Sequence, residues 1–417
     1  MGDAIGTSER GDALRVSAAT VVAATLVVLF LGYLVKLPCV TGPWDGRQYG
    51  KLPCYSDVVP LWYTEGLDRG AFPYVTADNE YPVLTGLTMA VAAVPATDAA
   101  SFFNWTALLL AGAAVGTALL LHRMAGARAL WFALAPTLLV YGFVNWDLLA
   151  VLFATFATLA YLRGRDAAAG AWLGLGAAAK LYPGSLAVPF AVGRLRDPGA
   201  DRAGAVRVAA FAALAWGLVN APFALTGFAR WWRFFEFNAA RGADWDSLWY
   251  LAQRHLGFTW AVPVLNLLAF GGFVALATTL WVLKSAREPR FPAWSFGFPL
   301  LVAFLLTNKV YSPQYSLWLL PWFALAVPNL RLFALFEVFD VGVFLTRFRY
   351  FASLDPAIGP GLPFWPFEAF LLLRAATLVA CLVWWVRRPA GRLAEGLVAA
   401  GPVPADTPVV AGRESAP

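Results

Sequence analysis

Long apolar segments alternate with short polar ones along most of the chain. A membrane-spanning helix needs roughly 17–25 mainly apolar residues, and twelve segments approach or reach this length. They lie at 16–38, 99–122, 129–144, 147–163, 167–180, 182–194, 205–224, 259–284, 291–309, 314–328, 331–347 and 365–386. Short or broken helices among them are tolerated where they line a cavity instead of facing lipid. The pattern therefore predicts an all-α, polytopic membrane protein with about 12 transmembrane helices.

One further apolar stretch, Tyr81 to Ala96, does not fit this plan. Pro82 and Pro95 interrupt it, and counting it as a span would reverse the sides of the basic loops that follow. We expect a helix that lies in, or dips into, the outer membrane interface.

Composition supports a bilayer as the solvent. The chain has 417 residues, of which 60% are hydrophobic and 13% charged, whereas soluble domains are about 45–50% apolar and about 25% charged. We expect a short cytoplasmic tail at 1–15, one transmembrane domain at 16–388 and a disordered cytoplasmic tail at 389–417, which is rich in Ala, Gly and Pro. The first apolar segment is too long for a typical signal peptide and is expected to remain as a span.

The net charge of +6 does not indicate a nucleic-acid partner. The basic residues lie in short loops between apolar segments, as they do in cytoplasmic loops of membrane proteins, and not on a soluble module. With the N-terminus inside, more than half of them fall on the inner side. The chain is therefore predicted to be a multi-pass plasma-membrane protein whose N- and C-termini are both cytoplasmic.

The first long outer loop, 39–98, begins with two cysteines. Cys39 and Cys54 would lie on the oxidising side, where a disulfide is favoured over two free thiols. The sequence YSDVVPLWYTEGLDRG follows, in which Ser56 can cap a helix that carries Asp57 in its first turn. Helical spacing would place Asp57, Leu61, Glu65 and Asp68 on one face. Asp57 could instead be only a partner of the helix dipole.

The second long outer loop, 228–258, contains FARWWRFFEFNAARGADWDSLWYLAQRHLG. Aromatic residues alternate with charged ones in its first half, which is typical of an interfacial helix anchored by aromatic side chains. Anchoring explains the following NAARGADWDSLWY less well, because its polar residues do not anchor.

Polar residues recur at the outer ends of the predicted spans. Charges within a bilayer are costly and usually face a cavity. The groups that approach one level of the membrane are Asp57, Glu80, Asn145, Asp147, Lys180, Asn308, Lys309 and Gln314. Each has a structural alternative: Lys180 could snorkel, Asp147 could cap its helix, Lys309 could be a flanking cation, and Asn145 and Gln314 could join helices.

A second charged group lies in mid-span. Arg374 is predicted to pair with Glu337 or Asp340 on the neighbouring helix, as a structural ion pair far from the outer loops.

The order of the motifs YSDVVPLWY, EYPVL, NWDLLAV, GAAAKLYP, FNAARGADWDSLWY and SPQYSLWLLP resembles glycosyltransferase family 87. These are polyprenyl-phosphate-mannose-dependent enzymes of the GT-C superfamily, and the resemblance runs from about residue 20 to about residue 325. It implies about a dozen helices around an outer cavity that holds a lipid-phosphate sugar. The sugar would move with inversion to a hydroxyl, normally giving an α-mannosyl product.

The resemblance also implies roles for residues. The catalytic base would be Asp57, because a positioned carboxylate can accept the proton of the attacking hydroxyl. The chain departs from the family at Val83, where a proline is frequent, and at Ser312, Pro313 and Gln314, near which a histidine is frequent.

The leaving lipid phosphate needs cations and hydrogen-bond donors more than an acid. The predicted donor-binding residues are Lys180, Tyr182, Asn238, Arg241, Lys309 and Gln314. The predicted sugar and acceptor pocket consists of Glu80, Tyr81, Asn145 and Asp147. We expect no required metal, since His122 and His255 fall on opposite sides of the membrane. The partners would be a polyprenyl-phosphate sugar donor, a glycolipid or glycan acceptor, and membrane lipids.

The main rival hypothesis is a transporter or flippase of lipid-linked sugars. Transporters often carry internal repeats and a polar site at the midplane, whereas this chain has no clear repeat and gathers its polar groups at one face. A related GT-C enzyme using arabinofuranose or glucose, and a member that binds lipid-linked sugar without catalysis, are further alternatives.

Overall fold

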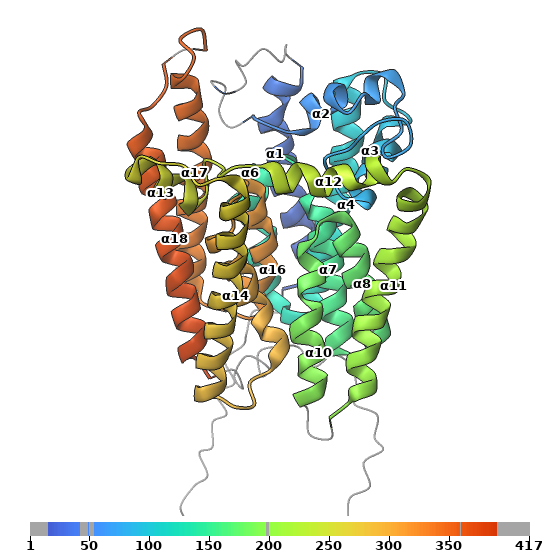
Figure 1. Cartoon of the computed structure of the whole chain (residues 1–417), viewed down its shortest axis with the longest axis vertical. Coiled ribbons are helices and arrows are strands. Elements are labelled where there is room, and N and C mark those ends of the chain that lie inside the picture. Colours follow the sequence, from blue (N-terminus) through green and yellow to red (C-terminus); the bar gives the residue numbers. More distant parts are fainter. Residues whose placement is uncertain (1–15, 42–48, 50–53, 197–199, 359, 390–417) are drawn as a thin grey trace, which may run out of the picture.

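The computed structural model describes residues 16–41, 49, 54–196, 200–358 and 360–389, and within these ranges it has helices and no named strand. The predicted 1–15 tail and nearly all of the 389–417 tail lie outside the described residues. Most long helices run side by side as a bundle, and α12 (Phe228–Ala240) lies across one end of it (Figure 1). We call this end, which also carries α2 and α3, the cavity end.

The helices not yet given bounds are α1 (Ala18–Val40), α2 (Val58–Thr64), α3 (Val83–Ala93), α4 (Ala99–Ala125), α5 (Ala129–Ala133), α6 (Pro136–Tyr141), α7 (Asp147–Leu162), α8 (Asp166–Ala179), α9 (Tyr182–Ser185), α10 (Ala187–Arg196), α11 (Arg202–Thr226), α13 (Leu248–Leu256), α14 (Val262–Arg287), α15 (Gly297–Thr307), α16 (Leu320–Leu325), α17 (Leu330–Ser353) and α18 (Phe364–Arg387). Short 3-10 turns lie at Leu67–Arg69, Gly126–Arg128, Ala293–Phe296 and Pro313–Leu319.

Every predicted apolar segment falls on helical structure, although several are broken. Within the described residues, five helical segments are long and apolar enough to cross a membrane, namely 18–40, 99–133, 202–226, 262–287 and 364–387. Three shorter apolar helices lie at 83–93, 147–162 and 293–307. The protein is therefore an all-helical, multi-pass membrane protein, and the number of about twelve spans stays a prediction.

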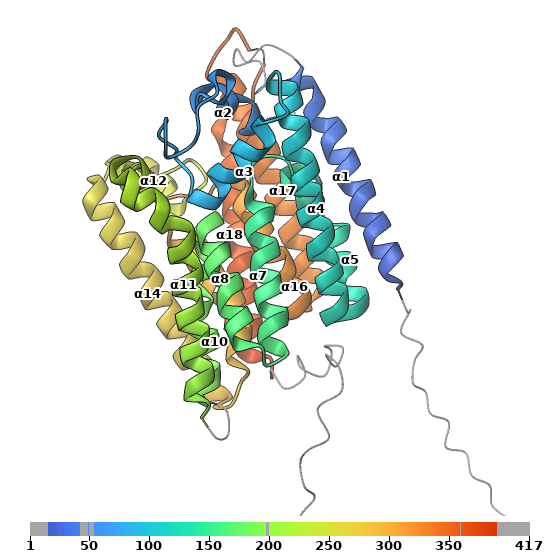
Figure 2. The ribbon, with the colours of Figure 1, turned by 90° about the vertical axis from the view of Figure 1, so that its right-hand side faces the viewer.

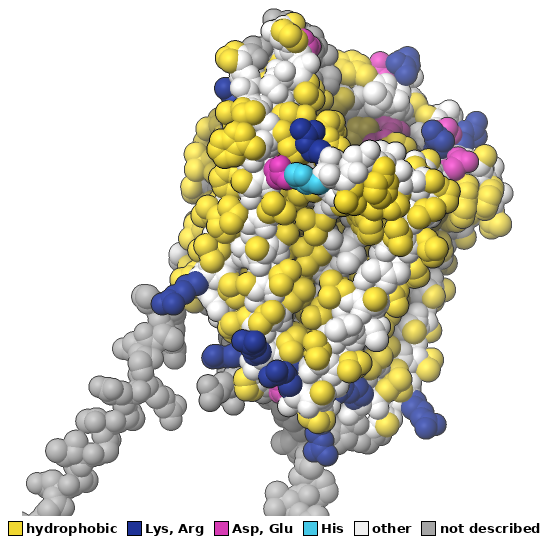
Figure 3. Space-filling model, turned by 60° about the vertical axis from the view of Figure 1, so that its left-hand side comes forward, with side chains coloured by type: hydrophobic (Ala, Val, Ile, Leu, Met, Phe, Trp, Pro, Cys, Tyr) yellow, Lys and Arg dark blue, Asp and Glu magenta, His cyan; other side chains and the backbone are white. Residues whose placement is uncertain are grey.

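The surface agrees with a membrane setting. Figure 3 shows a broad band of hydrophobic side chains between two charged ends. At the cavity end Lys and Arg are mixed with Asp and Glu, and at the opposite end Lys and Arg predominate. The beginning of α1 and the end of α18 both lie at this basic end (Figures 1 and 2). The described ends of the chain are thus on the same side of the bundle.

Small residues let the helices approach closely beneath the cavity. On α8, Gly170 and Gly174 face α11, and a Cβ atom added at either would lie 2.3 Å from a backbone oxygen, that of Val208 or Ala212. Helix pairs in membranes use such small residues spaced four apart to gain close packing, because lipid supplies no hydrophobic drive between helices. This contact fixes α8, whose last residue precedes Lys180.

The first outer loop forms less helix than its spacing predicted. α2 ends at Thr64, and Gly66 has a left-handed φ of 71° that begins a separate 3-10 turn containing Asp68. The expectation that Asp57 and Asp68 share one helical face is therefore wrong, because a glycine turn intervenes. The predicted interfacial helix within 81–96 is present as α3, tilted near the cavity end (Figure 2).

Candidate active site

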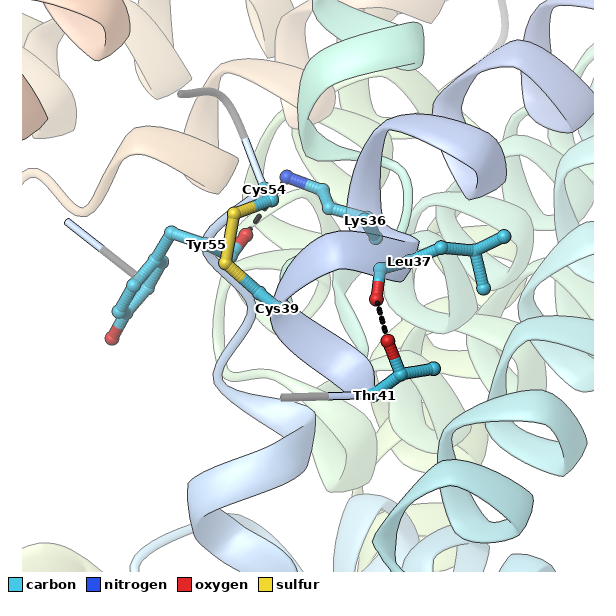
Figure 4. The surroundings of a disulfide bond; sticks show 6 residues. All are labelled: Lys36, Leu37, Cys39, Thr41, Cys54 and Tyr55. Carbon is cyan, nitrogen blue, oxygen red and sulfur yellow. Dashed lines mark hydrogen bonds between the residues drawn. A yellow bond between two sulfur atoms is a disulfide. The ribbon is translucent and has the colours of Figure 1, made fainter. Parts of the chain in front are cut away.

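The disulfide between Cys39 and Cys54 fastens the chain before α2 to the end of α1. The Cα atoms of the two residues are 5.5 Å apart, and the neighbouring Lys36 ammonium donates a 2.8 Å hydrogen bond to the carbonyl of Tyr55 (Figure 4). Both links hold the segment that carries Asp57 against the bundle.

Two further bonds fix the backbone at Asp57. Its N–H donates to the carbonyl of Val144 at 2.8 Å, and the Ser56 hydroxyl donates to the carbonyl of Phe143 at 2.7 Å. Asp57 stands at the N-cap position of α2, yet its side chain makes no capping hydrogen bond. The carboxylate is thus available for other partners, which argues against a role confined to the helix dipole.

The Asp57 carboxylate lies between two hydrogen-bond donors. The Tyr55 hydroxyl donates to Oδ1 at 2.6 Å, and the Asn145 amide donates to Oδ2 at 2.9 Å. The same amide nitrogen lies 2.7 Å from the Tyr81 hydroxyl oxygen. The structure therefore brings Asp57 of the first outer loop together with Asn145, which lies in the turn before α7.

Opposing effects set the pKa of Asp57. Burial raises the pKa of this carboxyl above its usual range, because a charged form is costly to desolvate. Hydrogen bonds from Tyr55 and Asn145 and the positive charges of Lys180 and Arg347 lower it in part. Such a carboxyl remains an acceptor that is more basic than an exposed aspartate.

Lys180 pairs with Asp147 across two helices. Its ammonium is 3.2 Å from Asp147 Oδ2, and the Trp318 indole donates to Oδ1 at 2.7 Å. The Lys180 side chain is 15% exposed, whereas that of Asp147 is wholly buried. The ammonium also lies 5.3 Å and 5.2 Å from the ring centres of Tyr81 and Tyr315. Lys180 is thus held as an oriented cation and not as a snorkelling one.

Breaks in the helices place these polar groups. α8 stops at Ala179 and Lys180 is extended. The Thr85 hydroxyl donates at 2.7 Å to the buried Ala179 carbonyl at the end of the helix. α15 likewise stops before Asn308, and the Trp249 indole donates to the Thr307 carbonyl at 2.7 Å. Backbone polar groups in a membrane protein must be bonded internally wherever a helix stops. The breaks are therefore built to line a cavity.

The second outer loop closes over this region. Lys309 donates to the carbonyls of Ala239 and Arg241 at 3.1 and 2.5 Å, and its own carbonyl accepts from Asp244 N at 2.8 Å. Arg241 lies 3.6 Å from the Asp244 carboxylate. The Asn238 amide donates to the Phe234 carbonyl within α12. The loop is therefore tied to the break after α15.

A cavity of about 850 Å³ joins these groups. The predicted residues that line it are Asp57, Glu80, Tyr81, Asn145, Lys180, Tyr182, Asn238, Arg241, Lys309 and Gln314. Asp147 does not line it, because its carboxylate is buried and bonded to Lys180 and Trp318. Its role in the sugar and acceptor pocket stays a prediction.

Glu80 is a second acid on the cavity wall. Burial raises the pKa of its carboxyl, as does the charge of Asp57, while Arg241 and Lys180 lower it. With Asp244, the cavity thus combines three carboxylates with several cations, as donor and acceptor chemistry require.

The mid-span ion pair is present but lies nearer the loops than predicted. The Arg374 guanidinium donates to Asp340 Oδ1 at 3.1 Å and to the Asp246 carbonyl, in the second outer loop, at 3.1 Å. Glu337 is instead hydrogen-bonded to the N–H and hydroxyl of Thr137. The Arg374 pair therefore supports the loop above the cavity.

Sequence reasoning missed several wall residues. Arg347 on α17 donates to Asp246 Oδ2 at 3.0 Å and lines the cavity with Trp245 and Phe348. Arg347 ends the predicted apolar segment 331–347 and was therefore taken for a flanking cation. Tyr55 directly precedes the Ser-Asp pair that was singled out. Within the described ranges, no group of three or more His, Cys, Asp or Glu side chains could hold a metal ion.

Comparison with known proteins gives the class of the molecule. The family model of glycosyltransferase family 87 matches residues 80–313. No curated protein matches the chain. Crystal structures of ArnT from Cupriavidus metallidurans are similar to it. The form bound to undecaprenyl phosphate has 15% identity and a TM-score of 0.41, covering 91% of this chain and 77% of ArnT. The apo form has 16% identity and a TM-score of 0.43, covering 91% and 78%.

The family match and the apolar helices described above therefore define a membrane glycosyltransferase. The chain belongs to glycosyltransferase family 87. The matched region begins at Glu80, later than the resemblance from about residue 20 suggested, so Asp57 lies before it while Lys180, Arg241 and Lys309 lie within it.

Proposed function

We propose that this protein transfers mannose from a polyprenyl-phosphate donor to a hydroxyl of a glycan or glycolipid acceptor, with inversion at the anomeric carbon. The observation that carries the proposal is the Asp57 carboxylate, held by Tyr55 and Asn145 in the same cavity as Lys180 and Arg241. The reaction needs a base that takes the proton of the attacking hydroxyl and cations that stabilise the leaving phosphate.

The reaction balances without a further reagent. The acceptor oxygen forms a bond to the anomeric carbon as the bond from that carbon to the phosphate oxygen breaks. The electron pair leaves with the polyprenyl phosphate, and the hydroxyl proton passes to Asp57. A positioned base of this kind is commonly worth about 10²–10⁴-fold in rate.

The cation-bearing wall suits the leaving phosphate. Lys180 and Arg241 provide the charge, and Lys309 adds charge while its ammonium holds the 239–241 backbone. Tyr182, Asn238 and Gln314 offer polar atoms to the same part of the cavity. Asp147 contributes indirectly, because it orients Lys180. Glu80, Tyr81 and Asn145 would contact the transferred sugar.

The apolar part of the cavity suits the prenyl chain. Phe270 and Phe273 on α14 and Leu301 and Phe304 on α15 line it. α14 faces outward along most of its apolar length, so a lipid can reach this wall from the bilayer. The basic residues at the opposite end of the bundle favour a cytoplasmic position for that end. The cavity would then face the extracytoplasmic side, and both termini would be cytoplasmic.

The direct test is sugar transfer in membranes that contain the full-length protein. Asp57→Asn should reduce transfer from labelled polyprenyl-phosphate-mannose by roughly 10²–10⁴-fold, because Asn cannot accept the proton. Asp68→Asn is the matched control, since Asp68 lies in the same loop, outside the cavity, and pairs with Arg69. Equal activity of Asp57→Asn and wild type would remove Asp57 as the base. Donor that crosses the membrane without being consumed would indicate a flippase instead.

A further inference from the structure

A second wall of the cavity is built from aromatic rings, of which only the Tyr55 hydroxyl enters the transfer chemistry above. Tyr55 stacks on Phe348 with ring centres 4.5 Å apart, and Tyr49 stacks on both at 5.7 and 5.9 Å. Trp245 meets Phe351 edge to face at 5.3 Å. All five line the cavity. We call this set, Tyr49, Tyr55, Trp245, Phe348 and Phe351, the aromatic wall.

The two oxygens of Asp57 separate this wall from the cationic one. Oδ2 accepts from Asn145, which contacts Tyr81, over whose ring Lys180 lies. Oδ1 accepts from Tyr55, the first ring of the aromatic wall. The base therefore stands where the two walls meet. Since the phosphate of the donor is placed on the cationic wall, the attacking hydroxyl must arrive from the aromatic wall.

The position of the wall does not suit the prenyl chain. Phe348 and Phe351 lie at the end of α17, which projects beyond α12 at the cavity end (Figure 1), and Trp245 lies in the 241–247 loop. Tyr49 and Tyr55 come from the first outer loop. Polar groups are interspersed with the rings, including the hydroxyls of Tyr49 and Tyr55 and the Asp244 carboxylate. An apolar stretch without such polar groups is offered instead by Phe270 and Phe273 on α14 and by Leu301 and Phe304 on α15.

The charged groups at this wall are already paired with one another, and Arg241 is a second cation on Asp244. The Arg347 guanidinium lies 3.0 Å from Asp246 and 3.8 Å from Asp244. A cation shared by two carboxylates offers little to an anionic ligand. The ligand of this wall is therefore expected to be neutral.

Rings with part of their faces open to a polar cavity bind the C–H face of a pyranose. The face of an aromatic ring is electronegative, and the C–H groups of a sugar are polarised by their oxygens. Trp245 and Phe351 are each only half-buried. We infer that the aromatic wall is the acceptor subsite and that it binds a neutral sugar ring stacked against Trp245 and Phe351, with one hydroxyl directed to Asp57. This inference rests on the proposed function, because it names the acceptor of that reaction.

The test uses the full-length protein in lipid nanodiscs and octyl α-D-mannopyranoside below its micelle concentration as the neutral acceptor. Binding is measured by saturation-transfer NMR and transfer with labelled polyprenyl-phosphate-mannose. Trp245→Ala should raise the KM for the mannoside on the order of tenfold and leave kcat and the donor KM within about twofold. Trp245→Phe should restore most of the affinity, which a variant that merely misfolds would not show.

Phe270→Ala, on the apolar wall, is the control and should raise the donor KM alone. An unchanged mannoside KM in Trp245→Ala, or a rise in its donor KM, would overturn the inference, as would a wild-type protein that binds no mannoside. If the mannoside binds in a Trp245-dependent way but no sugar is transferred, the binding subsite is supported and the transferase function is rejected. Failure of the inference can thus be told apart from failure of the proposed function.

Discussion

Removal of the Lys180 ammonium should have two separable effects. Lys180→Met keeps an unbranched apolar stem but leaves the wholly buried Asp147 carboxylate with only the Trp318 indole as its partner. Breaking one side of a buried ion pair costs about 3–5 kcal/mol in the free energy of unfolding. Losing a cation that stabilises the leaving phosphate should lower kcat by roughly 10²–10³-fold.

A double variant separates these effects. Asp147→Asn in the Lys180→Met background removes the uncompensated charge while retaining an acceptor for Trp318, so most of the lost stability should return. Transfer should remain as low as in Lys180→Met. Thermal unfolding of the detergent-purified protein, followed by tryptophan fluorescence, measures the first quantity, and labelled sugar transfer measures the second.

The reasoning would be refuted by either of two results. Recovery of transfer in the double variant would mean that Lys180 acts only through the stability of Asp147. An unfolding midpoint in Lys180→Met equal to that of wild type would mean that the pair is not the buried contact described.

Three further predictions follow from packing, cross-linking and protonation. Gly174→Ala should force α8 and α11 apart by about 1 Å, from 2.3 Å toward the 3.4 Å of ordinary contact, and lower the unfolding midpoint, since overpacking costs about 1–3 kcal/mol. Gly217→Ala, where a Cβ atom would meet open space, is the control and should stabilise the protein slightly. Equal unfolding midpoints of Gly174→Ala and Gly217→Ala would contradict the packing argument. Cys39→Ser removes the disulfide that closes a loop of 15 residues and should lower the free energy of unfolding by about 3 kcal/mol. A reductant should lower the unfolding midpoint of the wild type and leave that of the variant unchanged. Burial raises the pKa of Asp57, and a protonated carboxyl cannot accept the acceptor's proton. Transfer should therefore fall as the pH drops through this pKa, at a pH higher than the pKa of an exposed aspartate. Tyr55→Phe removes a hydrogen bond that lowers the pKa of Asp57. The fall in transfer at acid pH should then begin at a higher pH, and an unchanged pH profile would mean that another group causes the fall.

The course of the chain could be read largely from its pattern. Apolar segments predicted from hydropathy all coincide with helical structure. This works because the thickness of the bilayer sets the length of apolar sequence that a spanning helix needs. The helix break at Lys180 was predicted because the short segments 167–180 and 182–194 flank it. The end of α15 before Asn308 was not, because the predicted segment 291–309 continued past it. The end of α2 was not, because a single glycine at position 66 outweighed the helical spacing around it.

The candidate site was predictable only as a set of residues that approach one level of the membrane. Asn145 and Asp57 are 88 positions apart, and no local pattern states that they touch. Asp147 was assigned to the pocket because it lies at the outer end of a predicted span, whereas its bonds to Trp318 and Lys180 hold its carboxylate in the interior. Arg347 was missed because a basic residue at a helix end is usually a flanking cation.

The most direct measurement is a structure of the full-length protein with a non-transferable phosphonate analogue of polyprenyl-phosphate-mannose. The account predicts the phosphonate against Lys180 and Arg241, the prenyl chain along Phe270 and Phe273, and the anomeric carbon facing Asp57 with room for one hydroxyl between them. A phosphonate seated on the aromatic wall, or an anomeric carbon turned away from Asp57, would contradict it.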